Sequence, residues 1–155
     1  MSGKKVEFTT QEGPSGRKVE FTIPGCPIAK GRPRFSRQGT FVRTFTPEKT
    51  CRYEQLVQLS FMQADQPKLN GAVRVKILAY FPIPKSASKK KQKMMAEGEI
   101  RHTTKPDGEN VSKAILDALN KMAYDDDSNI VELHIEKWYS EEPRAEITIE
   151  EIGTP

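Results

Sequence analysis

The sequence predicts a single α+β domain in which helices pack on a mixed or antiparallel sheet. Three observations predict this class. The chain has 155 residues, 35% of them hydrophobic, which suits one modest core. Several segments alternate apolar and polar residues with the period of a strand, and two others repeat apolar residues at helical spacing. We assign residues 18–155 to the domain and residues 1–17 to an N-terminal extension.

Four segments have the alternation of strands. Residues 18–24 repeat the motif Lys-Val-Glu-Phe-Thr of residues 5–9, and we expect the second copy to be a core strand. The first copy is either an added edge strand or a disordered extension. A second strand covers residues 73–81, before two prolines. Residues 131–135 and 145–149, joined by a turn, predict two antiparallel strands whose order in the sheet the pattern does not give.

Three helices are expected between these strands. Thr46 as the N-cap and Pro47 at the first helical position open a helix that ends before Pro67. Residues 86–96 form an exposed helix that Gly98 stops. The third helix begins after residues 105–108, and its apolar stripe has five members. These are Val111, Ile115, Ala118, Leu119 and Met122.

The two signs of charge are separated along the chain. Residues 1–106 contain 21 Lys and Arg against 8 acidic residues, whereas residues 107–155 contain 4 against 13. A basic body favours a polyanionic partner such as nucleic acid, and an acidic segment would repel that partner unless cations intervene. A divalent metal would reconcile the two. The alternative is that the strands interleave both signs into one mixed surface.

Composition also excludes several classes of protein. No run of 18 apolar residues is present and the N-terminus lacks the apolar stretch of a secretory signal, so we expect an intracellular, cytoplasmic protein without membrane association. The two cysteines and two histidines do not have the spacing of a zinc site.

Acidic residues gather at both ends of the third helix. Asp107 and Glu109 precede or open it, and residues 125–127 are three consecutive aspartates beyond its end. Two carboxylates at ~4 Å repel by roughly 4 kcal/mol at an effective dielectric near 20, so such clusters often bind a cation, and hard oxygen ligands select magnesium or manganese. The alternatives are a capping role for Asp107, exposed ion pairs along Glu109, Lys113 and Asp117, and a solvated turn for the aspartates.

Three motifs with a specific spacing decide between these interpretations. They read Lys105-Pro106-Asp107-Gly108-Glu109-Asn110-Val111-Ser112-Lys113, then Asp117-Ala118-Leu119, then Asp126-Asp127-Ser128-Asn129-Ile130. This pattern resembles the signature of the RusA family of Holliday-junction resolvases. Residues 27–34 and 46–48 also resemble the N-terminal part of those proteins. The resemblance covers roughly residues 18–151.

The resemblance implies a RusA-like fold and a magnesium-dependent endodeoxyribonuclease, with manganese as a possible substitute. It implies that Asp107, Glu109 and Asp127 bind the metal with Asp126 nearby, and that Lys113 is the essential basic residue. Glu109 stands where the family usually has aspartate, which moves its carboxylate by about a bond length and puts the metal position in doubt. The resemblance also implies a homodimer that nicks two symmetrically placed strands of four-way DNA.

A basic segment upstream is the candidate DNA-binding element. It contains no acidic residue between Phe21 and Pro47, and residues 35–42 predict a hairpin that turns at Gln38-Gly39. The candidate contacts are Lys30, Arg32, Arg34, Arg37 and Arg43. With Phe35 and Phe41, such a loop would grip phosphates or wedge at a junction centre, and a solvated basic loop is the alternative.

Two other functions remain open at this point. A DNA-binding module without catalysis would use the basic part alone and would act without metal. A magnesium nuclease acting on flaps or other branched DNA would use the same carboxylates on another substrate.

Overall fold

A four-stranded mixed sheet forms the centre of the protein. The computed structural model describes residues 16–31, 34–45 and 47–152. Its main sheet has the strand order β1-β6-β4-β5. The strands are β1 (Lys18–Pro24), β4 (Val73–Pro82), β5 (Ile130–Ser140) and β6 (Arg144–Glu151). The α+β class is confirmed. The first copy of the duplicated motif, residues 5–9, lies outside the described residues.

The last two strands run antiparallel to each other, as predicted, but they are not neighbours in the sheet. β6 pairs with β1 and β4, both antiparallel, and β5 pairs with β4 in parallel. β4 therefore lies between the last two strands, and residues 141–143 cross its end to join them. Strands are about 4.8 Å apart, so three residues span the roughly 10 Å required. The alternation revealed each strand but not its neighbour.

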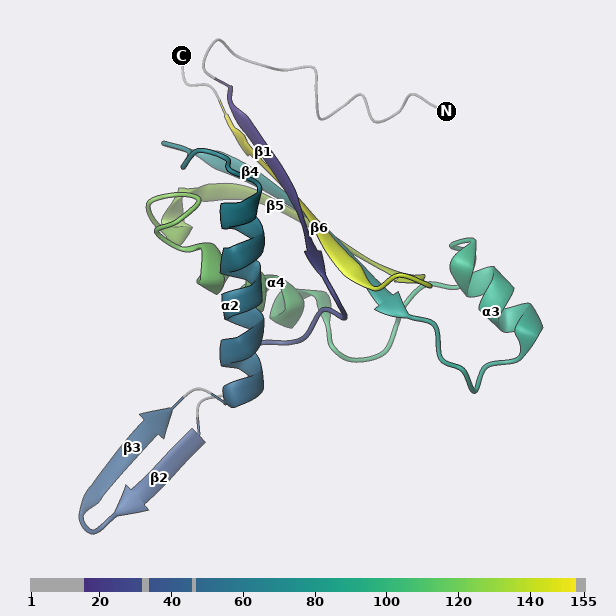
Figure 1. Ribbon diagram of the computed structural model, residues 1–155, viewed down its shortest axis with the longest axis horizontal. Coiled ribbons are helices and arrows are strands. Elements are labelled where there is room, and N and C mark those ends of the chain that lie inside the picture. The colour runs from purple at the N-terminus through teal and green to yellow at the C-terminus, as the bar shows by residue number, and fades with distance from the viewer. Residues whose placement is uncertain (1–15, 32–33, 46, 153–155) are drawn as a thin grey trace.

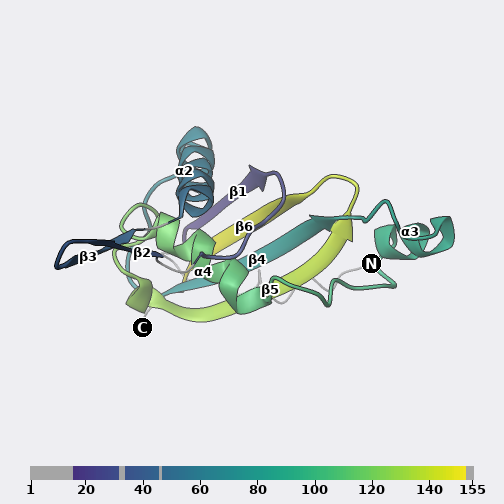
Figure 2. The same cartoon turned by 90° about the horizontal axis from the view of Figure 1, so that it is seen from below.

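Two helices cover one face of this sheet (Figures 1 and 2). They are α2 (Glu48–Gln63) and α4 (Gly108–Leu119). Inward residues of all strands meet them, and the rings of Phe21 in β1 and Phe61 in α2 pack edge to face with centroids 5.6 Å apart. The predicted core strand at residues 18–24 is confirmed, because its residues alternate between exposed and buried along its whole length.

The helix boundaries differ from the prediction in two places. Pro47 is the N-cap of α2 rather than its first residue, because its ψ of 145° is extended. Thr46, the predicted cap, lies outside the described residues. α4 ends at Leu119, so Met122 lies beyond it in a turn where Lys121 has a φ of 71°. That left-handed backbone cannot continue an α-helix.

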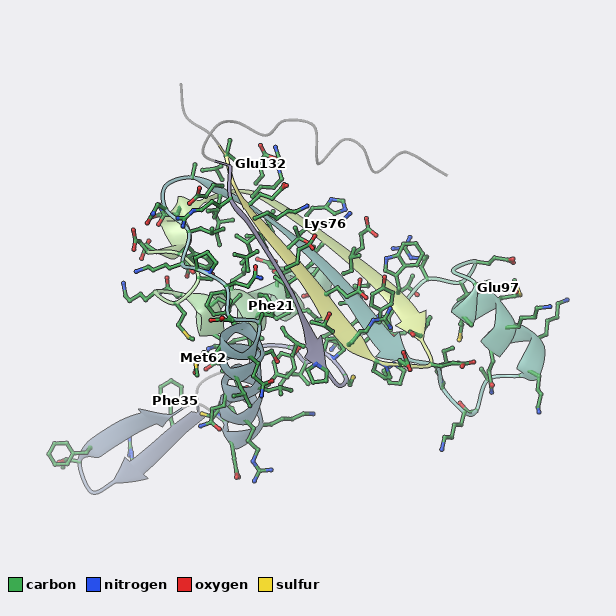
Figure 3. The ribbon with its side chains drawn as sticks, turned by 45° about the horizontal axis from the view of Figure 1, so that its top comes forward. Phe21, Phe35, Met62, Lys76, Glu97 and Glu132 are labelled. Atoms are coloured by element: carbon green, nitrogen blue, oxygen red, sulfur yellow. The ribbon has the colours of Figure 1, made fainter. Side chains whose placement is uncertain are left out.

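Two elements project from opposite ends of the body (Figure 1). One is the hairpin of β2 (Arg34–Gln38) and β3 (Phe41–Phe45), whose turn at Gly39 and Thr40 is one residue later than predicted. Figure 3 shows Phe35 on this hairpin, away from the main sheet. The other is α3 (Lys89–Ala96), which buries none of its residues and ends before Gly98, as expected.

The second face of the sheet carries side chains of both signs. Arg74 contacts Glu132 at 2.7 Å and Glu150 at 3.2 Å. Figure 3 shows Lys76 and Glu132 among the side chains of these strands. Part of the charge separation along the chain is thus neutralised where the strands meet. In the described ranges, no helix is both long enough and apolar enough to span a bilayer.

Candidate active site

An open groove of about 390 Å³ lies between α4 and the start of β5. It brings together Glu109, Lys113 and Asp127, three of the residues predicted to act in catalysis, although the last comes from a separate segment. Its lining residues are Glu109, Ser112, Lys113, Leu116, Asp117, Asp127, Ile130, Val131, Glu132 and Leu133. The groove is therefore lined by acidic side chains, one ammonium group and several apolar residues.

The α4 side of the groove is a row of charged residues one turn apart. Glu109, Lys113 and Asp117 follow each other at intervals of four, and the Lys113 Nζ lies 3.8 Å from Asp117 Oδ2. Of the ion pairs that the alternative interpretation places along the helix, the one between Lys113 and Asp117 is present. It does not exclude a catalytic role, because the same side chains line the groove.

The opposite side is built by a short 3-10 helix, Asp127–Asn129. Asp126 caps it by accepting the backbone N–H of Ser128 at 2.9 Å, and the Asn129 side chain accepts the N–H of Asp126 at the same distance. Hydrogen bonds from the side chain and the backbone of Ser128 lower the pKa of the Asp126 carboxyl group. They hold Asp126 outside the groove lining and present the next residue, Asp127, to it.

The Asp127 carboxylate lies close to two other carboxylates, those of Asp117 and Asp126. Burial and repulsion from Asp117 and Asp126 raise the pKa of its carboxyl group, against weaker opposing contributions from Tyr124 and Lys113. Repulsion of this kind is relieved by a cation or by a proton. The groove therefore favours a positively charged ligand at Asp127.

Asp107 lies just before α4 and caps it. Its Oδ1 accepts the backbone N–H of Asn110 at 2.9 Å, and it is absent from the lining of the groove. The loop before it is held by Lys137, whose Nζ donates to the carbonyls of Thr104 at 2.8 Å and Pro106 at 2.7 Å. Burial lowers the pKa of Lys137, although attraction to Asp107 opposes this effect.

The donor set fits a hard divalent cation. Glu109, Asp117 and Asp127 offer carboxylate oxygens to one groove, and their mutual repulsion is only partly offset by Lys113. As the side chains lie, no three His, Cys, Asp or Glu residues of the described ranges are close enough to enclose an ion. Asp107 lies outside the lining, and its Oδ1 is bound to the Asn110 N–H. The groove thus supplies suitable ligands that have to rearrange on binding.

The predicted DNA-binding residues have different surroundings. Lys30 is paired with Glu54 at 2.6 Å and with Asp117 at 3.3 Å, so it is engaged inside the protein. Arg37 is exposed on β2. Arg34 and Arg43 lie in the same hairpin, where the structure describes only their backbone, and Arg32 lies outside the described residues.

Sequence reasoning did not assign three residues that shape the site. Asp117 belongs to the second motif, but its contact with two lysines required the fold. Buried Tyr124 donates its hydroxyl to the carbonyl of Leu116 at 2.8 Å and so fixes the turn that leads to the aspartates. Lys137 could have been found from the sequence, because it occupies a position of β5 where the alternation predicts an apolar residue, two residues after Ile135.

The comparison with protein families is decisive at this point. Residues 24–150 match the family described as "Endodeoxyribonuclease RusA". The chain belongs to the RusA endodeoxyribonuclease family. Family membership makes it a Holliday-junction resolvase, a nuclease of DNA recombination that binds branched DNA and depends on a divalent metal. The match contains every motif that lines or borders the groove.

A bacterial relative is similar over nearly its whole length. The chain is 42% identical over 138 residues to "Uncharacterized protein YqaN" of Bacillus subtilis (strain 168). The match covers 87% of this chain and 97% of the relative. The two proteins are therefore similar throughout the domain, not only at the motifs.

Proposed function

We propose that this RusA-family enzyme resolves Holliday junctions by paired symmetric nicks that require magnesium, in DNA recombination and repair. The observation that supports it best is the groove, where Glu109 and Lys113 of α4 face Asp127 from a separate segment. Carboxylates gathered beside a single ammonium group suit phosphodiester hydrolysis, because negative charge both binds metal and develops on the phosphate.

The roles that we propose for the residues are those that the RusA resemblance implies. Asp107, Glu109 and Asp127 would hold the ion with Asp126 adjacent, and manganese could replace magnesium because both prefer oxygen ligands. When bound, the ion would polarise the scissile phosphate and lower the pKa of an attacking water. Lys113 lines the groove and would stabilise the charge that develops on the phosphate oxygens. No covalent nucleophile is needed.

The hairpin is the element that we propose to contact the DNA. Phe35 and Phe41 each expose 72% of their surface, and Arg37 is exposed between them in the sequence. Two aromatic rings held in water by a projecting hairpin are costly unless a partner covers them. Phosphate contacts by the arginines and wedging of a ring at the junction centre would use these exposed groups.

Paired incision of a four-way junction requires two active sites, and we therefore propose a homodimer. One groove per chain cuts one strand, and two-fold symmetry of the dimer would match the symmetry of the junction. Light scattering of the free protein and of its junction complex tests this point. A single chain per junction at saturation would exclude it.

The decisive experiment is cleavage of a synthetic four-way junction with each strand labelled in turn. We expect symmetric nicks with magnesium, and we expect Asp107→Asn or Lys113→Ala to abolish cleavage while junction binding remains. Cleavage that survives both changes would reject the site. Equal cleavage of flap and four-way substrates would favour a nuclease of other branched DNA, and unaltered function in chelator would favour a binding module.

A further inference from the structure

We propose that Lys30 is a positioning residue of the active site: it holds Asp117 of α4 and thereby sets where the Lys113 ammonium group stands. This inference rests on the proposed function, since it concerns the rate of the same reaction. It replaces the prediction that Lys30 binds DNA phosphate.

The contacts of Lys30 form a chain that ends in the groove. Its Nζ lies 2.6 Å from Glu54 Oε2 on α2 and 3.3 Å from Asp117 Oδ2 on α4. The Nζ of Lys113 lies 3.8 Å from that same Asp117 oxygen. One carboxylate oxygen is therefore shared by two ammonium groups, one at the side of the groove and one behind it.

Exposure separates the two lysines. The side chains of Lys30, Glu54 and Asp117 are 23%, 23% and 27% exposed, whereas that of Lys113 is 59% exposed. Burial alone would lower the pKa of Lys30, but Glu54 and Asp117 outweigh it and the pKa is raised. Lys30 is thus a partly buried charge held by two carboxylates, whereas the more exposed Lys113 is the one that can turn towards a phosphate.

The backbone around Lys30 is also fixed. Its N–H donates to the carbonyl of Asn110 at 3.1 Å, and the N–H of Gly31 donates to the hydroxyl of Thr50 at 3.0 Å. A Cβ built on Gly31 would stand 2.5 Å from that hydroxyl and 3.1 Å from Pro47. The segment therefore lies pressed between the starts of α2 and α4, unlike a loop that follows a DNA backbone.

Lys30 decides how strongly Asp117 attracts Lys113. With Lys30 in place, its ammonium group partly neutralises the Asp117 carboxylate, which therefore attracts Lys113 only weakly. Without Lys30, Asp117 would draw Lys113 towards itself and away from the substrate, and it would repel Glu54 across the two helices. A displacement of about 1 Å at a catalytic group can cost on the order of a hundredfold in rate.

The two roles of Lys30 predict opposite results for its partner Glu54. If Lys30 positions Asp117, Glu54→Gln removes the ion pair that fixes the Lys30 side chain, so Asp117 is held less precisely and cleavage slows. If Lys30 binds phosphate, Glu54→Gln frees the ammonium group and removes a repulsive charge, so junction binding tightens. Each released phosphate contact changes the slope of log affinity against log salt by about 0.9.

The experiment measures the cleavage rate at saturating enzyme and the salt dependence of junction affinity in chelator. We expect Lys30→Met to lower the rate by roughly 10- to 100-fold with the affinity and its salt slope unchanged. Glu54→Gln should lower the rate in the same direction, and Lys30→Arg should restore most of it. The matched control is Glu48→Gln, which removes an exposed pair with Arg52 on the same helix and should leave the rate unchanged.

A second readout needs no cleavage. Tighter pairing with Asp117 in Lys30→Met should protect Lys113 from reductive methylation, relative to wild type. Unchanged reactivity of Lys113, or a lowered salt slope together with tighter binding by Glu54→Gln, overturns the inference. If Lys30→Met does not fold, Glu54→Gln decides both points. Lack of junction cleavage by wild type would count against the proposed function alone, because the methylation result stands by itself.

Discussion

Replacing Lys137 with methionine should loosen the loop that presents Asp107. The Lys137 ammonium group donates to two backbone carbonyls of that loop, those of Thr104 at 2.8 Å and Pro106 at 2.7 Å. Hydrogen bonds that involve a charged group each contribute roughly 1.5–3 kcal/mol. The bond to Thr104 is exposed and the bond to Pro106 is partly buried, so water recovers part of the loss. We expect a decrease of about 2 kcal/mol in the free energy of unfolding.

The assay for this change is urea unfolding followed by the fluorescence of Trp138, the only tryptophan, which is the next residue in β5. The magnesium concentration for half-maximal cleavage should also rise roughly tenfold, as is common when a group that orients a ligand is removed. Lys18→Met, an exposed lysine of β1, is the control. A free energy within about 0.5 kcal/mol of wild type with an unchanged magnesium requirement would refute this role.

Three further changes have definite outcomes. Asp127→Asn should abolish cleavage and yet stabilise the metal-free protein by a few tenths of a kcal/mol after solvent screening. Folding raises the pKa of Asp127, so the ionised carboxylate destabilises the folded protein above that pKa and has no effect below the pKa of the unfolded chain. Thermal melts of wild type and Asp127→Asn should therefore differ at pH 7 and coincide at pH 3. The same difference in melting temperature at both pH values would contradict this. Glu109→Asp should keep the cleavage rate within about tenfold of wild type, whereas Glu109→Gln should lose at least about 100-fold in a single-turnover assay; similar losses in both would show that the carboxylate is not a ligand. Gly31→Ala should destabilise the protein by about 1–3 kcal/mol in urea unfolding, because its Cβ meets the Thr50 hydroxyl at 2.5 Å; a neutral effect would mean that the segment can move.

The elements of the fold were predictable because each has a strong local period. The alternation in residues 18–24 and the apolar stripe of residues 108–119 identify a strand and a helix without any tertiary information. Pairing was not predictable in the same way. The position of β4 between β5 and β6 depends on the crossover connection through α3 and α4. Alternation within a strand does not show which other strand is adjacent to it in the sheet.

The site was predictable as a set of motifs but not as a set of contacts. Spacing identified Asp107 and Asp127, yet it did not show that Asp107 caps α4 outside the groove lining while Asp127 faces the groove. The basic neighbours of Lys30 in the sequence predict a phosphate contact. Its partners in the structure, Glu54 and Asp117, are distant in the sequence and become neighbours only when α2 packs against α4.

A Mn²⁺ titration followed by electron paramagnetic resonance tests most directly whether carboxylates from two separate segments share one ion. Glu109→Gln and Asp127→Asn should each weaken binding by roughly tenfold or more, and Glu141→Gln, beyond the end of β5, should not. If Mn²⁺ binds Asp127→Asn as tightly as wild type, the groove between α4 and β5 is not the metal site.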